Sequence, residues 1–143
     1  MTPLHALAHA VDHPAPARGT IAGWRLIAAI VLAPLSFSAQ VIGSYVVASS
    51  LCQDGARPQA YLWVMNATAI VVAVVGFMLA VSAWRAARGE KPGGAQAAVD
   101  VGEGRTRFLA LCGIWGSSIF LLAVLLDLTA IAAFGTCPGA QVH

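Results

Sequence analysis

A single carboxylate, that of Asp127, lies inside an otherwise apolar stretch of this sequence. Placing an aspartate at the middle of a membrane helix costs about 2.5 to 3.5 kcal/mol on insertion scales, so such a residue usually faces protein. Asn66 and Tyr45 fall at similar distances from the ends of two other apolar stretches. We expect Asp127, Asn66 and Tyr45 to form one buried polar layer. The layer either bonds the helices together or relays a proton or cation. A relay needs a connected series of groups, which favours the structural interpretation.

Three histidines near the start of the chain also have spacing that could support chemistry. His5, His9 and His13 follow one another at intervals of four, so on a helix neighbouring imidazoles could approach one metal ion. No further ligand beyond Asp12 accompanies them. We therefore predict a disordered tail or a short amphipathic helix on the membrane surface, with no metal site.

The composition identifies the elements that must position these residues. Hydrophobic residues make up 59% of the 143-residue chain and charged residues 10%, and the mean hydropathy is +0.78. Soluble domains contain about 25% charged residues. Apolar residues form three blocks, 24–51, 61–84 and 108–134, each longer than the roughly 20 residues that span a bilayer. Because three strands cannot close a barrel, the sequence predicts an all-α fold of three transmembrane helices.

The basic residues predict how these helices are oriented. Seven of the eight lie before or at the start of the first helix or around the second loop: Arg18, Arg25, Arg85, Arg88, Lys91, Arg105 and Arg107. Only Arg57 lies in the first loop. The positive-inside rule then places residues 1–23 and a flexible loop, 85–107, in the cytoplasm, and a tail, 135–143, outside. We expect a multi-pass protein of a bacterial inner membrane, with a transmembrane domain spanning 24–134.

In that orientation Cys52 and Cys137 follow the first and third helices on the same outer side. An oxidising periplasm allows a disulfide to persist there, and we predict one between them. Cys112, near the inner end of the third helix, should stay reduced. The alternative is a pair of exposed thiols that handle copper or exchange disulfides, which the absence of a Cys-x-x-Cys pair disfavours.

Small and polar residues recur at helical spacing on each predicted helix. Such faces suit close contact between membrane helices. The predicted packing positions are Ser36, Gln40 and Gly43 on the first helix, Ala69, Ala73 and Gly76 on the second, and Gly113, Gly116 and Ser117 on the third. Pro34 predicts a kink in the first helix.

Several classes of activity lack their motifs here. The sequence contains no nucleophile elbow, phosphate-binding glycine loop or zinc motif, and no histidine lies inside a predicted helix to ligate a haem. We predict a protein that is not an enzyme and that has no cofactor. Its expected partners are other integral membrane subunits and lipids, with no nucleic acid.

The arrangement resembles small three-helix proteins encoded beside proteobacterial haem-copper cytochrome c oxidase genes. The likeness spans 24–138 and rests on the stretch 32–45, Cys52 at the end of the first helix, Arg107-Phe108 at the start of the third, and the terminal 135–138, Gly-Thr-Cys-Pro. Ser36 and Phe37 stand where a tryptophan is expected. The resemblance implies an accessory subunit or assembly partner of a respiratory oxidase.

The leading functional hypothesis is therefore a non-catalytic accessory subunit of a larger membrane complex, in particular a respiratory oxidase. One alternative is a homo-oligomeric proton or cation conductor that uses Asp127. The other is a periplasm-facing thiol or copper-handling assembly factor that uses Cys52 and Cys137.

Overall fold

The computed structural model describes residues 21–53, 58–90 and 104–134. This part of the chain is helical, and the prediction of an all-α fold with three membrane-length helices is confirmed. The predicted amphipathic segment, with His5, His9 and His13, lies outside the described residues, as does the tail 135–143.

The three long helices are α2 (Gly23–Gln53), α3 (Gln59–Ala86) and α5 (Arg105–Phe134). Each begins and ends up to three residues beyond the predicted apolar block, except that α5 ends where predicted. Hydropathy marks the hydrocarbon core, whereas a helix continues to satisfy its own backbone hydrogen bonds through the headgroup region.

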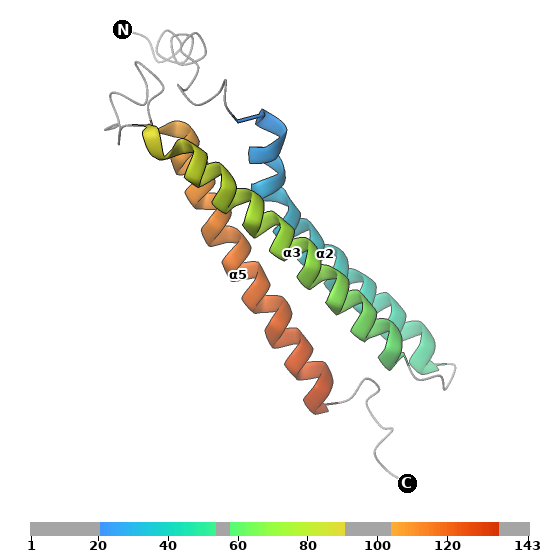
Figure 1. Cartoon of the computed structure of the whole chain (residues 1–143). Coiled ribbons are helices and arrows are strands. Elements are labelled where there is room, and N and C mark those ends of the chain that lie inside the picture. Colours follow the sequence, from blue (N-terminus) through green and yellow to red (C-terminus); the bar gives the residue numbers. More distant parts are fainter. Residues whose placement is uncertain (1–20, 54–57, 91–103, 135–143) are drawn as a thin grey trace, which may run out of the picture.

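The helices form an elongated bundle in which every pair is in contact (Figure 1). α2 and α5 run in the same direction and α3 runs opposite to both. We call the end where α2 and α5 finish and α3 begins the α2–α3 end, and the other the α3–α5 end. The blue first turns of α2 run in a different direction from its cyan remainder (Figure 1), because Pro34 cannot donate a backbone hydrogen bond.

The interior consists mainly of small side chains and the outer surface of large apolar ones. Buried positions include Ala29, Ala33, Ala69, Ala73, Ala80 and Ala110. Valine, leucine, isoleucine and aromatic side chains are exposed along all three helices. In water this distribution would be unfavourable, whereas in lipid it lets the backbones approach closely while apolar side chains contact acyl chains. The helices are thus built for a bilayer.

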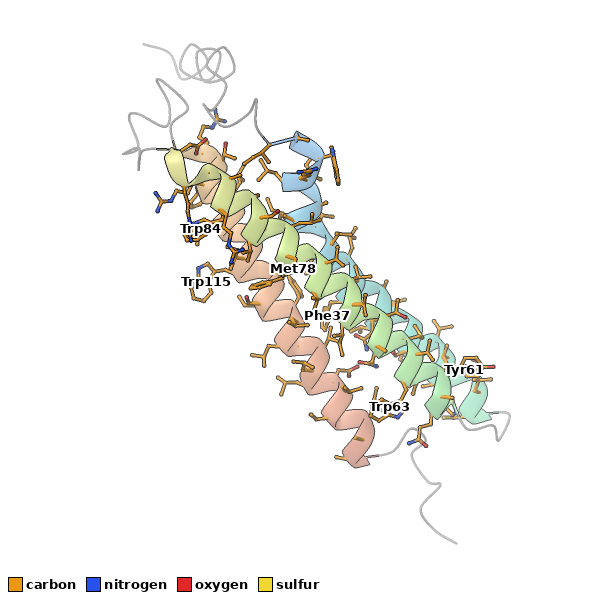
Figure 2. The ribbon with its side chains drawn as sticks, in the orientation of Figure 1. Phe37, Tyr61, Trp63, Met78, Trp84 and Trp115 are labelled. Atoms are coloured by element: carbon orange, nitrogen blue, oxygen red, sulfur yellow. The ribbon has the colours of Figure 1, made fainter. Side chains whose placement is uncertain are left out.

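Several tryptophan and tyrosine side chains lie toward the two ends of the bundle. Tyr61 and Trp63 lie at the α2–α3 end, and Trp84 lies toward the other (Figure 2). The guanidinium of Arg88 lies 4.6 Å from the Trp84 ring centroid, and that of Arg25 lies 5.6 Å from the Trp24 ring centroid. Tryptophan, tyrosine and arginine in these positions are typical of membrane interfaces.

Parts of the loop predicted to be flexible are instead helical, which corrects its bounds. Arg85 continues α3, a 3-10 turn η2 (Ala87–Gly89) follows, and Arg105 and Arg107 belong to α5. Of this loop, 91–103 lies outside the described residues. The backbone N–H of Arg107 donates to Glu90 Oε2 at 3.2 Å. This carboxylate therefore caps the start of α5, where free N–H groups favour an anion.

Candidate functional site

Three polar side chains, one from each helix, meet inside the bundle. Gln40 Nε2 donates to Asp127 Oδ2 at 2.5 Å and approaches Asn66 Oδ1 at 3.4 Å. Gln40 is 3% exposed, Asn66 is fully buried and Asp127 is half-buried. We call these residues the polar cluster. Gln40 lies at its centre, since it bonds to both other helices.

Helical periodicity explains why these three residues face inward. Gln40 follows Ala33 by seven residues, Asn66 precedes Ala73 by seven, and both alanines are buried. Asp127 follows the buried Val124 by three. Positions three or seven apart share one face of a helix, so each polar residue extends a buried face.

The hydrogen bonds of the cluster are unevenly distributed over the Gln40 amide. Its Nε2 has a third acceptor, Ser44 Oγ, at 3.4 Å, and Asn66 Nδ2 donates to the Leu62 carbonyl oxygen at 3.0 Å. Gln40 Oε1, by contrast, is buried and has no hydrogen-bond partner within the described structure. An unmade hydrogen bond of this kind costs about 1 to 3 kcal/mol. The cluster thus has one unfilled acceptor.

The structure corrects the predicted membership of this layer. Asn66 and Asp127 belong to it, but Tyr45 is 74% exposed and lies outside it. Tyr45 follows Gln40 by five residues, which turns it about 140° around the helix. The prediction grouped Tyr45 with the other two residues because it lies at a similar distance from a helix end. That count gives depth in the membrane but not the direction in which a side chain points around the helix. The sequence placed Gln40 on the same helix face as the small residues, which correctly predicted that it is buried. That pattern indicated helix packing only and did not predict its hydrogen bond to Asp127.

Two close helix contacts lie between the polar cluster and the α3–α5 end. A Cβ added at Gly113 would lie 3.1 Å from Ala80 Cβ and 3.2 Å from the Ala29 carbonyl oxygen. At Gly76 it would lie 3.3 Å from Leu32 Cβ. All three helices therefore depend on small residues here to reach their separation.

Most of the other predicted packing positions lie in helix contacts, but one does not. Ala69, Ala73 and Ser117 are buried, and Ser117 Oγ donates to the Ala29 carbonyl oxygen at 3.4 Å. Gly43 lies under the Met65 side chain. Gly116 has no atom within 4 Å of an added Cβ, so its assignment to a contact is corrected. It lies three residues from Gly113, at the edge of the contact face.

Ser36 makes a local hydrogen bond. Its Oγ donates to the carbonyl oxygen of Ala33 at 2.9 Å, within α2. The hydroxyls of Ser36 and Ser117 are both bonded to backbone carbonyls, so neither extends the polar cluster through the bundle.

The cysteines occupy two different settings. Cys112 is free and exposed on α5. Cys52 is half-buried in the last turn of α2, at the end where α5 also finishes. Cys137 lies outside the described residues, so its pairing with Cys52 stays a prediction.

The chemistry available inside the described bundle is hydrogen bonding by one carboxylate, two amides and neighbouring hydroxyls. Across residues 21–53, 58–90 and 104–134, no three His, Cys, Asp or Glu side chains are grouped to hold a metal ion. Comparisons with known proteins found no family model, no curated protein and no solved structure that matches this chain.

Proposed function

We propose that the chain is a non-catalytic accessory subunit of a larger integral membrane complex. The likeness of 24–138 to small proteins encoded beside haem-copper oxidase genes makes a respiratory oxidase the first complex to test. The proposal includes the bacterial inner membrane, a cytoplasmic α3–α5 end and a Cys52–Cys137 bridge on the outer side.

The observation that carries the proposal is the engagement of Asp127 with Gln40. Asp127 is the residue on which the conductor alternative depends, and its carboxylate accepts a hydrogen bond from a neighbouring helix. Buried polar groups that bond across helices hold membrane bundles together. The hydroxyls of Ser36 and Ser117, nearer the α3–α5 end, are bonded to carbonyls, which supports a structural role over a relay.

The thin packing of the bundle supports a role among other subunits. In α2, α3 and α5, only 17%, 28% and 22% of an apolar stretch of 18 residues is buried within the chain. Most of each helix is therefore available to other helices or to lipid.

Gentle extraction tests the proposal directly. Wild-type protein, tagged and expressed at its native level, is extracted in a mild detergent, and the mass and subunit ratio of the purified species are measured. We expect a fixed ratio with other integral membrane chains. A chain that comes out alone or as a symmetric oligomer contradicts the proposal.

A flux assay separates the accessory role from the conductor alternative. In liposomes, the wild type and Asp127→Asn should show equally low proton and cation flux, because asparagine keeps the hydrogen bond to Gln40 without a titrating group. Flux that is present in the wild type and lost in Asp127→Asn would favour the conductor.

A further inference from the structure

A groove lies between α2 and α3 on the lateral surface of the bundle. Its volume is about 440 Å³, and its lining comes from two nine-residue segments, 32–40 of α2 and 64–72 of α3. The apolar lining residues are Leu32, Leu35, Ala39, Val64, Met65, Ala69 and Val72. At 1.5 Å per residue each segment is about 12 Å long, a length suited to two turns of a third helix.

Three polar side chains also line the groove, and each already uses its donor elsewhere. Ser36 Oγ donates to the Ala33 carbonyl oxygen, Thr68 Oγ1 donates to the Val64 carbonyl oxygen, and Gln40 Nε2 donates into the polar cluster. What these side chains leave available is acceptor oxygen. Gln40 Oε1 is buried and has no partner in the described structure, so a donor from outside the bundle reaches it only when a neighbouring side chain moves.

Depth restricts what could supply the missing donor. Gln40 contacts Asn66 and Asp127, each of which is seven residues, about 10 Å along the axis, from the α2–α3 end of its helix. This depth is inside the hydrocarbon core, nearer the α2–α3 end than its middle. Lipid headgroups do not reach this depth, and acyl chains carry no donor. A side chain on another transmembrane helix does reach it.

We propose that this groove receives a transmembrane helix of a partner subunit, which presents a serine, threonine, asparagine or glutamine to Gln40 Oε1. The small side chain of Ala39, which is exposed in the lining, allows close approach of the incoming helix. Met65, with its flexible unbranched side chain, can move to admit it. The inference rests on the proposed function, because it identifies the surface through which the accessory subunit binds its complex.

A photocrosslinking amino acid tests the position of the partner. It replaces Val64, which lines the groove and is 65% exposed, or Leu126, which lies on α5 outside the groove and is 61% exposed. After irradiation in native membranes, adducts are identified by mass spectrometry. We expect position 64 to capture an apolar segment of a different chain with one of the four named polar residues within a turn of the adduct.

A second pair of variants tests whether the groove must be empty. Ala39→Trp fills it, whereas Ala67→Trp places the same side chain on an exposed position of α3 outside the lining. We expect Ala39→Trp to reduce the co-purified partner at least tenfold, and Ala67→Trp to leave it within twofold. Neither substitution alters the polar cluster, so both variants should be recovered at wild-type yield.

The outcomes separate failure of this inference from failure of the proposed function. Capture of lipid only, or of a second copy of this chain, at position 64 overturns the inference, as does a partner retained by Ala39→Trp. A different chain captured at position 126 but not at 64 would leave the accessory role standing with another docking face. If no other chain co-purifies with the wild type, the proposed function itself fails.

Discussion

Gln40 joins the three helices through one side-chain amide. Its hydrogen bonds to Asn66 and Asp127 connect α2 to α3 and α5 at one depth. An aspartate buried without such a partner would be costly in a bilayer, so the glutamine is what makes Asp127 tolerable there. The sequence showed that Asp127 needed partners, but the choice of Gln40 over Tyr45 depended on rotation about the helix axis.

Replacing Gln40 should therefore destabilise the isolated bundle. Gln40→Leu removes the donor to Asp127, and we expect the free energy of unfolding to fall by about 1 to 2 kcal/mol. Ser38→Leu, on an exposed position of the same helix, should change it by less than about 0.5 kcal/mol. Unfolding in mixed detergent micelles measures both, and equal losses would contradict the central role of Gln40.

At the scale of the helices, small residues set how closely the elements approach. Gly113 and Gly116 lie three residues apart in α5, and the sequence pattern predicted that both pack against another helix. Only Gly113 lies against the other helices, between Ala29 and Ala80. The two positions carry the same residue, with the same hydropathy and size, so the sequence pattern could not show which of them lies in a helix contact.

The two glycines provide a matched comparison. Gly113→Ala brings a methyl group against the Ala29 carbonyl oxygen, and we expect a loss of about 1 to 3 kcal/mol of stability. Gly116→Ala meets open space, so it should be neutral or gain up to about 1 kcal/mol from helix propensity. Thermal unfolding of the purified variants in detergent would show the two effects, and a loss at Gly116 equal to that at Gly113 would overturn this assignment.

At the scale of the whole molecule, the bundle has two chemically different ends. Arg25, Arg85, Arg88, Arg105 and Arg107 all lie near the α3–α5 end, along with the Glu90 cap of α5. Among the described residues the α2–α3 end carries no lysine or arginine. This asymmetry is the basis for the proposed orientation.

Labelling from each side of the membrane tests that orientation. In a variant whose native cysteines are replaced by alanine, Gln59→Cys and Gly89→Cys place single thiols at the two ends, both at exposed positions. An impermeant maleimide should label Gln59→Cys in intact spheroplasts and Gly89→Cys only after permeabilisation. The opposite pattern would place the basic end outside and contradict the positive-inside assignment.

The sequence by itself determined that three helices exist, about where they begin and end, and which residues are unfavourable in lipid. These are one-dimensional properties, since bilayer thickness and the cost of burying charge act on each segment separately. The tertiary structure decided which glycine lies in a contact, which side chain bonds to Asp127, and that Glu90 caps α5. Those outcomes depend on the tilt, rotation and offset of one helix against another, which arise only when the three surfaces pack together.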